Sequence, residues 1–350
     1  MKSDRQLTGD EEFQGWPVET QLAVLRPNEA RFSLGFLQAE PISYFPTIGK
    51  YWVELLHAIG VDVGVTGTQT SLDFPENLFR VTPIEVEGEI CVLGFDEQSF
   101  RAIVDGISPG CQGRAADLVF EYVERRLVAT MAKAWAGASA IQCYYLPLSA
   151  TDAVEIVASI ALLLDLGGVA AAVYLGVGPR FTERLDMLWR GDNLAEHFTR
   201  DSAGVGGDPK RISVVIAELD VPPAMLIDYL RPGAVIDLEQ TAHPAVSLRI
   251  NGEPWARGEL CQLNGKFAAK IQTLHSVAEA LAPGTTRVLI EMAHADLDDE
   301  AIFEHSRVGA VLVTNVEASS RASIVLGGEH VGVGDLGEID GGFALHVLPK

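Results

Sequence analysis

A serine between two glycines is the first motif in this sequence that could carry out chemistry. Residues 106–110 read Gly-Ile-Ser-Pro-Gly and fit the Gly-x-Ser-x-Gly pattern, in which a serine on a sharp turn acts as a nucleophile. That mechanism uses the backbone N–H of the following residue to stabilise an oxyanion, and Pro109 has no N–H. We therefore expect a loop after a helix here, and no hydrolase.

A glycine-rich run near the C-terminus resembles a nucleotide-binding fingerprint. Gly332, Gly334 and Gly337 have the Gly-x-Gly-x-x-Gly spacing that lets a backbone approach a pyrophosphate. That motif opens a helix and needs an acidic residue further along the chain, and the 13 residues after Gly337 are too few for both. We expect these glycines to serve a structural repeat, and we expect no cofactor.

Imidazole and carboxylate groups gather before and within the segment 298–305. His294, Asp296, Asp298, Asp299 and His305 are residue types that bind metals. Asp298 and Asp299 also lie where the N-terminus of a helix favours acids, which is the simpler interpretation. We therefore expect neither a metal site nor catalytic residues.

The four cysteines, Cys91, Cys111, Cys143 and Cys261, are far apart in the sequence and include no Cys-x-x-Cys pair. This spacing favours neither a zinc site nor a disulfide framework. The start of the chain lacks the apolar core of a signal peptide. The apolar stretch 156–177 carries Asp165 and Gly167-Gly168 at its middle, which favours a buried hairpin over a membrane span. We expect a cytoplasmic protein that is not inserted in a membrane.

The last third of the chain contains one pattern twice. Residues 212–273 align with residues 288–349 without a gap, at a shift of 76 residues. Gly233-Ala234-Val235 falls on Gly309-Ala310-Val311, and the glycine-acid pair at 252–253 recurs at 328–329. Shared glycines indicate backbone requirements of a duplicated module. Each module of about 70 residues buries little surface alone, so we expect the two copies to pack together.

Within each copy, local signals predict one short helix followed by strands. The helices are predicted at 224–230 and 298–303. Residues 246–250 alternate apolar and polar side chains, Asn251-Gly252 is a strong hairpin signal, and a second strand follows at 253–263. Each copy is therefore rich in β-structure.

These modules resemble a known domain. The runs 230–233, 246–252 and 256–260 are similar to the SpoA (surface presentation of antigens) domain of the FliM/FliN family. The second copy fits less fully, because Val308 replaces Pro232 of the first. Two tandem SpoA domains resemble the SctQ/HrcQ group, the cytoplasmic-ring proteins of type III secretion injectisomes, whereas flagellar FliM would carry one.

The first two thirds of the chain predict an α+β domain. We expect helices at 51–56, 95–104, 115–135 and 180–188, and strands near 61–65, at 79–93 and in a hairpin at 152–177. This order, and the run 154–168 in particular, resembles the CheC-like middle domain of FliM. The fold class expected is α+β, a CheC-like domain followed by two tandem β-rich SpoA domains.

We divide the chain into five segments on these patterns. Residues 1–45 are a loosely structured lead-in of uncertain fold, residues 46–195 are the CheC-like domain, and residues 196–210 are a linker. The SpoA copies occupy residues 211–275 and 286–350.

The resemblance to CheC implies a phosphatase as an alternative. Those enzymes use an Asp or Ser, a Glu four positions later, an Asn three further on, and a downstream proline. Asp117, Glu121 and Pro147 fit, but Glu124 takes the place of the Asn that orients the attacking water. A carboxylate would be repelled by phosphoryl oxygens and cannot donate the hydrogen bond of an amide. We expect Asp117 and Glu121 to lie on the solvated face of a helix.

Association is the function that the SctQ resemblance implies. The expected partners are a SctL-like stator, the secretion ATPase, a SctK-like adaptor, another SpoA chain or a second copy, and chaperone-substrate complexes, at the cytoplasmic face of the secretion apparatus. The net charge of −22 disfavours nucleic acid as a partner. A flagellar switch protein is the alternative in the same class, although residues 1–21 show no clear motif for binding a response regulator.

Apolar side chains on the predicted strands are the candidate partner contacts, with burial in the core of the repeat left open for each. They are Val246, Leu248, Ile250, Trp255, Leu260 and Phe267 in the first copy, and Ile324, Leu326, Val331, Leu336, Phe343 and Val347 in the second. Trp255 is favoured, because an aromatic side chain is a common interface anchor and Val331 takes its place in the second copy.

Overall fold

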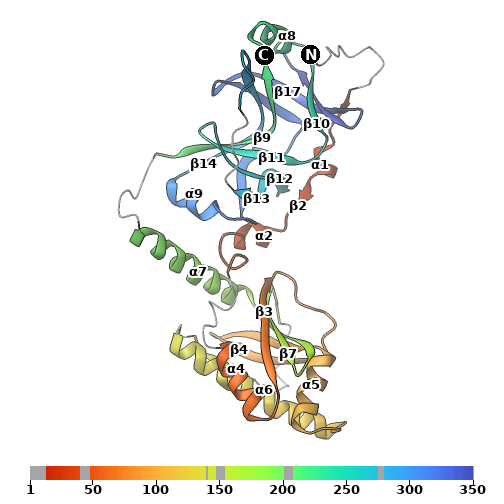
Figure 1. Cartoon of the computed structure of the whole chain (residues 1–350), viewed down its shortest axis with the longest axis vertical. Coiled ribbons are helices and arrows are strands. Elements are labelled where there is room, and N and C mark those ends of the chain that lie inside the picture. The colour runs from red at the N-terminus through yellow and green to blue at the C-terminus, as the bar shows by residue number, and fades with distance from the viewer. Residues whose placement is uncertain are drawn as a thin grey trace. The chain divides into compact units, whose positions relative to one another are not determined.

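The computed structural model of this protein describes residues 13–39, 48–138, 141–146, 154–200, 208–274 and 280–349. The chain forms two compact units, of which one is Gly35–Ser202 and the other combines the segments before and after it (Figure 1). Both units contain helices and strands, so the fold is mixed α+β, as the sequence predicted.

A six-stranded antiparallel sheet organises the first unit. Its strand order is β3-β7-β8-β5-β4-β6. The predicted hairpins are confirmed by the pairing of β4 with β5 and of β7 with β8. The strands are β3 (Val63–Ser71), β4 (Arg80–Val86), β5 (Glu89–Phe95), β6 (Cys143–Tyr145), β7 (Ala158–Leu166) and β8 (Val169–Val177).

The helices that the structure describes in this unit are α4 (Ile48–Ala58), α5 (Glu97–Ile107), α6 (Arg114–Ala138) and α7 (Pro179–Arg200). Phe120 of α6 packs edge-on against Phe95 of β5, with ring centroids 4.9 Å apart. The apolar stripe predicted along α6 is buried from Val123 to Trp135, but Leu118 is exposed. Helix α7 continues to Arg200 and β9 begins at Lys210, so the predicted linker is too long at its start.

The second unit repeats its elements at the spacing found in the sequence. Strands β9 (Lys210–Val221) and β14 (Thr286–Leu297) coincide at both ends after the shift of 76. So do the pairs that follow them. These are β10 (Val235–Thr241) and β15 (Val311–Glu317), β11 (Ala245–Ile250) and β16 (Arg321–Leu326), and β12 (Glu253–Leu263) and β17 (Glu329–Ile339). Strands β13 (Lys266–Leu274) and β18 (Gly342–Val347) begin at equivalent residues.

The two copies exchange strands. The main sheet order is β10-β18-β17-β16-β14-β9-β11-β12-β13-β15. Strands β9 and β14 lie antiparallel at its centre, with Arg211 opposite Asp296 and Asp220 opposite Arg287. Strand β10 of the first copy pairs with β18 of the second, and β15 of the second pairs with β13 of the first. The expected packing of the copies is confirmed, and it takes the form of an intertwined pair.

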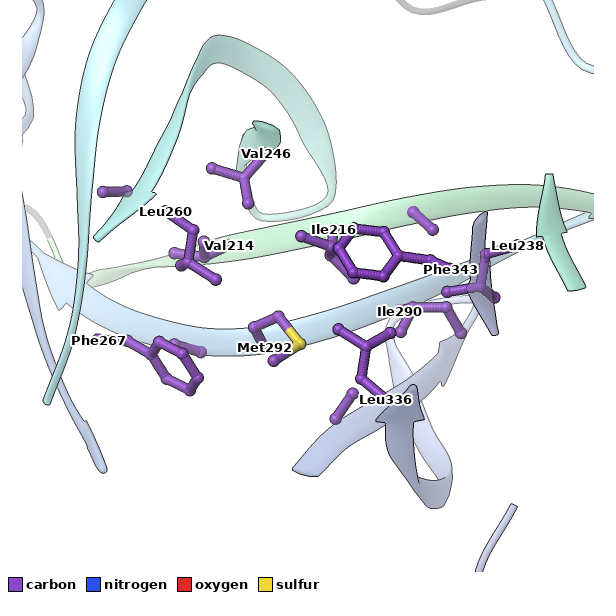
Figure 2. Packing of buried hydrophobic residues seen from close by; sticks show 14 of the residues in the cluster. Val214, Ile216, Leu238, Val246, Leu260, Phe267, Ile290, Met292, Leu336 and Phe343 are labelled. Atoms are coloured by element: carbon purple, nitrogen blue, oxygen red, sulfur yellow. The ribbon is translucent and has the colours of Figure 1, made fainter. Parts of the chain in front are cut away.

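One hydrophobic core serves both copies. Ile216 of β9 and Ile290 of β14 are buried in the same cluster as Phe267 and Phe343, which are equivalent residues of the two copies. Figure 2 shows these side chains gathered around the two central strands. Buried apolar residues from strands of both copies belong to this one cluster, so the two copies share an interior.

The glycines shared by the copies meet two backbone requirements. At the predicted hairpin, Asn251 and Gly252 have φ values of 48° and 89°, the pair of positive angles that a type I′ turn requires. Gly258 and Gly334 are equivalent glycines that lie close to a neighbouring strand. A Cβ atom on Gly258 would lie 2.5 Å from the carbonyl oxygen of Lys270, and one on Gly334 would lie 2.8 Å from that of His346.

Residues 13–34 differ from the loosely structured lead-in that the sequence predicted. They form β1 (Gln14–Gly15), α1 (Val18–Gln21), β2 (Ala23–Val24) and α2 (Pro27–Phe32) within the repeat unit. Trp16, Val18 and Leu22 are buried in its core. We call residues 13–34 the strap. Two-residue strands leave almost no periodic signal, which is why the sequence did not reveal them.

Candidate interaction surface

Most of the predicted contact residues lie inside the repeat unit. The eight that are buried are Val246, Leu248, Leu260, Phe267, Ile324, Leu336, Phe343 and Val347. Their side chains fill the interior shared by the copies, which is the alternative that the sequence analysis left open. They are therefore not surface contacts in this fold. Ile250, Trp255, Leu326 and Val331 are partly exposed, and partner contact through these four stays a prediction.

Trp255 lies where the two copies meet. It belongs to β12 of the first copy, and its indole Nε1 donates a hydrogen bond of 3.3 Å to Oγ of Ser306. Ser306 follows α9 (Asp299–His305) of the second copy and donates to the carbonyl oxygen of Ile302. The ring is thus held in place at one end while part of it stays accessible. A pre-positioned aromatic side chain loses little entropy on binding a partner.

Exposed apolar side chains that the sequence analysis missed lie beside the short helices. Ile227 of α8 (Leu226–Tyr229) is 81% exposed, and Val308, after α9, is 59% exposed. Met225, in the preceding 3₁₀ turn η1 (Pro223–Met225), is also exposed. The sequence predicted one short helix at 224–230, whereas the structure forms a 3₁₀ turn and a helix of four residues, which is too short to bury a complete face.

A charged cluster crosses the central strands on the side of the first copy. Arg287 of β14 donates from Nε to Oδ1 of Asp220 at 3.0 Å, and it lies 3.6 Å from the carboxylate of Glu218. Glu218 also accepts from Arg249 at 2.6 Å and from the hydroxyl of Ser247 at 3.0 Å. The hydrogen bond from Arg287 is the main cause that lowers the pKa of Asp220 below its ordinary value.

The second copy has a different cluster in the corresponding region. Arg211, the equivalent of Arg287, donates to the buried carboxylate of Glu291 at 2.5 Å and lies 2.9 Å from Nε2 of His330. His294 lies 3.5 Å from the same carboxylate. The two arginines therefore keep the pseudo-symmetry of the repeat, while their acidic partners differ.

A pocket of about 360 Å³ opens in the first copy beside this cluster. Its lining includes Glu218, Gln240, Ser247, Arg249, Arg257 and Gln272. In the second copy, valine stands at the positions equivalent to Gln240, Arg249 and Arg257. The pocket residues of the first copy are thus more polar than the residues at the equivalent positions of the second copy. The two halves of the repeat unit therefore present different surfaces.

The residues of the phosphatase alternative lie along α6 of the first unit. Asp117 is exposed, and Glu121 forms an ion pair with Arg125 at 2.7 Å. Glu124 is fully buried, where it accepts hydrogen bonds from Arg80, both of 3.2 Å, and from the hydroxyl of Thr82. This carboxylate is occupied by its own chain and cannot orient a water molecule. Pro147 lies outside the described residues.

The metal-ligand candidates have other roles. Asp298 caps α9 by accepting from the N–H of Ala301 at 2.8 Å, and Asp299 forms an ion pair with Lys210. His294 contacts Glu291, and His305 is buried with Nδ1 2.7 Å from the carbonyl oxygen of Ala301. Across the described ranges, no group of three or more His, Cys, Asp or Glu side chains could hold a metal ion.

The other two motifs lie in ordinary structural positions. Ser108 directly follows α5 as its C-terminal cap residue, as expected for a loop after a helix. The glycines at 332–337 lie within strand β17, so no helix follows them as a dinucleotide site would require.

Comparison with known proteins identifies one segment of the chain. Residues 209–276 match the family model described as the type III flagellar switch regulator (C-ring) FliN C-terminal domain. This segment is similar to a FliN C-terminal domain. The matched segment is the first copy of the repeat, and it supports a relationship to the FliM/FliN family. No curated protein matches the chain.

Several solved structures resemble the chain at low similarity. The FliM middle domain from H. pylori is 10% identical, with a TM-score of 0.32, over 49% of this chain and 99% of that domain. FliY from Thermotoga maritima is 14% identical, with a TM-score of 0.27, over 50% of this chain and 98% of that protein. A CheX chain in a CheX–CheY complex from Borrelia burgdorferi has a TM-score of 0.22 at 10% identity, over 39% and 97% of the two chains.

Of the helices that the structure describes, none is both long enough and apolar enough to span a membrane.

Proposed function

We propose that this protein is an assembly component of the cytoplasmic ring, or sorting platform, of a type III secretion injectisome. The intertwined pair of copies carries the proposal, because β10 with β18 and β13 with β15 make one folded unit from two FliN-like modules in a single chain. Such a unit resembles the tandem SpoA arrangement of the SctQ/HrcQ group. The protein would link the base to the stator and ATPase at the cytoplasmic face of the apparatus.

The surface chemistry supports association more than catalysis. Trp255, which is partly exposed, and Val308, which is exposed, supply apolar surface beside α9, and Ile227 supplies an exposed apolar group on α8. Partners that fit this surface are the SctL-like stator, a SctK-like adaptor, another SpoA chain and chaperone-substrate complexes. The buried ion pair of Glu124 with Arg80 argues against a CheC-like phosphatase.

A flagellar switch protein is the second candidate. The family model that matches residues 209–276 is itself described as a flagellar switch regulator, which favours this alternative. The second copy of the module in the same chain favours the injectisome. The two candidates differ in their partners, so the partners decide between them.

Co-purification from the native host tests the proposal. The tagged full-length chain is isolated beside Trp255→Glu and a matched control, Val81→Glu, which adds the same charge at an exposed valine of the other compact unit, outside the candidate contacts. We expect a secretion ATPase and its stator with the parent chain and with the control, and their loss from Trp255→Glu. Far-ultraviolet circular dichroism must show that both variants fold. Recovery of flagellar rotor proteins and a response regulator would instead establish the flagellar assignment.

A further inference from the structure

The two short strands of the strap bind equivalent positions of the two copies. Strand β1 pairs antiparallel with β17, with Gln14 opposite Glu338 and Gly15 opposite Gly337. Strand β2 pairs parallel with β12, with Ala23 opposite Cys261 and Val24 opposite Gln262. Positions 261 and 262 become 337 and 338 after the shift of 76. One continuous segment therefore binds the equivalent site on each of the two copies.

The repeat explains why these two sites exist and why the strap pairs antiparallel at one and parallel at the other. Pairing of β11 with β12 ends at Glu259, and pairing of β16 with β17 ends at Asp335, so the longer strands continue with an open edge. A segment that crosses two strands related by a pseudo-two-fold axis runs antiparallel to one and parallel to the other. The strap thus recognises the pair of copies, by adding strands to both edges.

Gly337 fixes the direction of the strap. A Cβ atom at Gly337 would lie 2.6 Å from the carbonyl oxygen of Gln14 and would collide with the ring of Phe13. The equivalent residue of the first copy is Cys261, whose side chain is buried in a cluster with Leu25. A reversed strap would bring Phe13 and Gln14 against that side chain, so the site accepts one direction only.

Buried side chains anchor the strap between its two strands. Trp16 is 3% exposed and packs edge-on against Phe343, with ring centroids 5.0 Å apart. The Trp16 N–H donates to the carbonyl oxygen of Leu336 at 3.0 Å, and the Leu25 N–H donates to that of Gln262 at 2.9 Å. The site is therefore built for this extended, apolar sequence.

We propose that this site also accepts the strap of a second copy of the chain, so that copies become linked by exchanged straps. The strap continues at Gly35 directly into the other compact unit, and it contacts the repeat from outside that repeat's own sequence. An identical strap from a neighbouring copy makes every contact described above, so exchange loses no interaction. Assembly raises the local concentration of neighbouring straps and favours the exchange.

Disulfide formation between two different chains tests the proposal. One chain carries Gln14→Cys and the other Glu338→Cys, which are register partners, and both carry Cys111→Ser to remove the accessible cysteine. The chains bear tags of different size, are refolded together from urea, and are oxidised. We expect a disulfide-linked heterodimer, because each chain alone lacks the partner cysteine.

Gly337→Ala tests the strap site, and Gly15→Ala is its matched control. These glycines face each other, and only Gly337 lacks space for a Cβ atom. Gly337→Ala in the acceptor chain should lower the yield of heterodimer about tenfold, equivalent to about 1.4 kcal/mol, and Gly15→Ala in the donor should not change it. Absence of the heterodimer would overturn the proposal if a Gln14→Cys, Glu338→Cys double variant closed its own disulfide. A parent chain that stays at the monomer mass of 37.6 kDa in light scattering at every concentration would overturn it as well. The test uses purified chain alone, so its failure leaves the proposed secretion function unaffected.

Discussion

Asp220 and Arg287 face each other across the two central strands, and their side chains form an ion pair at 3.0 Å. The equivalent pair, Asp296 and Arg211, also faces across these strands, but Arg211 bonds to Glu291 instead. The two Asp–Arg pairs are therefore equivalent in backbone register but differ in side-chain bonding. Asp296 can serve as the control position for substitutions of Asp220.

Asp220 should make the stability of the repeat unit depend on pH. Its pKa is lowered in the folded chain from an ordinary value of 3.8, so the unfolded chain binds a proton first as the pH falls. The stabilisation is present above about pH 4 and is lost as the pH falls through the lower folded pKa. Urea unfolding between pH 5 and pH 3 should show a smaller decrease in free energy for Asp220→Asn than for the parent, by at most about 1 kcal/mol because the pair is partly exposed. Asp296→Asn should behave as the parent does, and an equal effect of both variants would contradict the assignment.

Glu124 should stabilise the first unit through its buried ion pair. Glu124→Ala leaves the largely buried guanidinium of Arg80 without its anion, which costs about 3 kcal/mol in the free energy of unfolding. Glu121→Ala is the control, because the Glu121–Arg125 pair is more exposed and should contribute much less to the free energy of unfolding. Thermal and urea unfolding measure both. Similar losses in the two variants would show that Glu124 is not the buried charge that the geometry indicates.

Trp16 should hold the strap in place. Trp16→Ala removes a buried indole and should lower the free energy of unfolding of the repeat unit by about 3–5 kcal/mol. Val24→Ala, at an exposed strap position, should have little effect. Because Cys261 lies under Leu25, release of the strap should also increase the rate at which iodoacetamide alkylates Cys261. An unchanged alkylation rate in Trp16→Ala would mean that the strap remains bound without its tryptophan.

The cysteines should differ strongly in reactivity. Burial raises the pKa of the Cys91 and Cys143 thiols to about 12, and that of Cys261 to about 11. At pH 8 these three groups are thiols, which react poorly because the thiolate is the nucleophile. Cys111 is partly exposed, so iodoacetamide should label it first in the native chain. Mass spectrometry of the digested protein measures this order, and early labelling of Cys91 would be inconsistent with its burial.

Local features were predictable from the sequence because neighbouring residues encode them. Asn251-Gly252 adopts the two positive φ angles that its hairpin turn requires, whatever the strands pack against. The spacing of 76 residues also appears directly as the offset between β9 and β14. The apolar alternation on β11 predicted a buried face, but not whether that face covers a core or a partner.

The missed features depend on residues that are distant in the chain. Strand β10 alternates like any half-buried strand, and nothing in its own sequence indicates that β18 is its neighbour. Trp16 lies between Gly15 and Pro17 with no periodic pattern, so its burial beneath the repeat could not be inferred. Glu124 resembles any polar residue of α6 until Arg80 is placed opposite it.

The exchanged strands also constrain how this protein can be made. A ribosome releases β10 well before it synthesises β18, which begins at Gly342, and the strap emerges even earlier. Until β18 is synthesised, β10 and the strap have unpaired backbone groups and exposed apolar side chains. Such non-local pairing slows folding and leaves nascent chains prone to aggregation. The repeat unit should therefore fold after translation of the second copy. We expect a chaperone to bind the nascent chain during that delay.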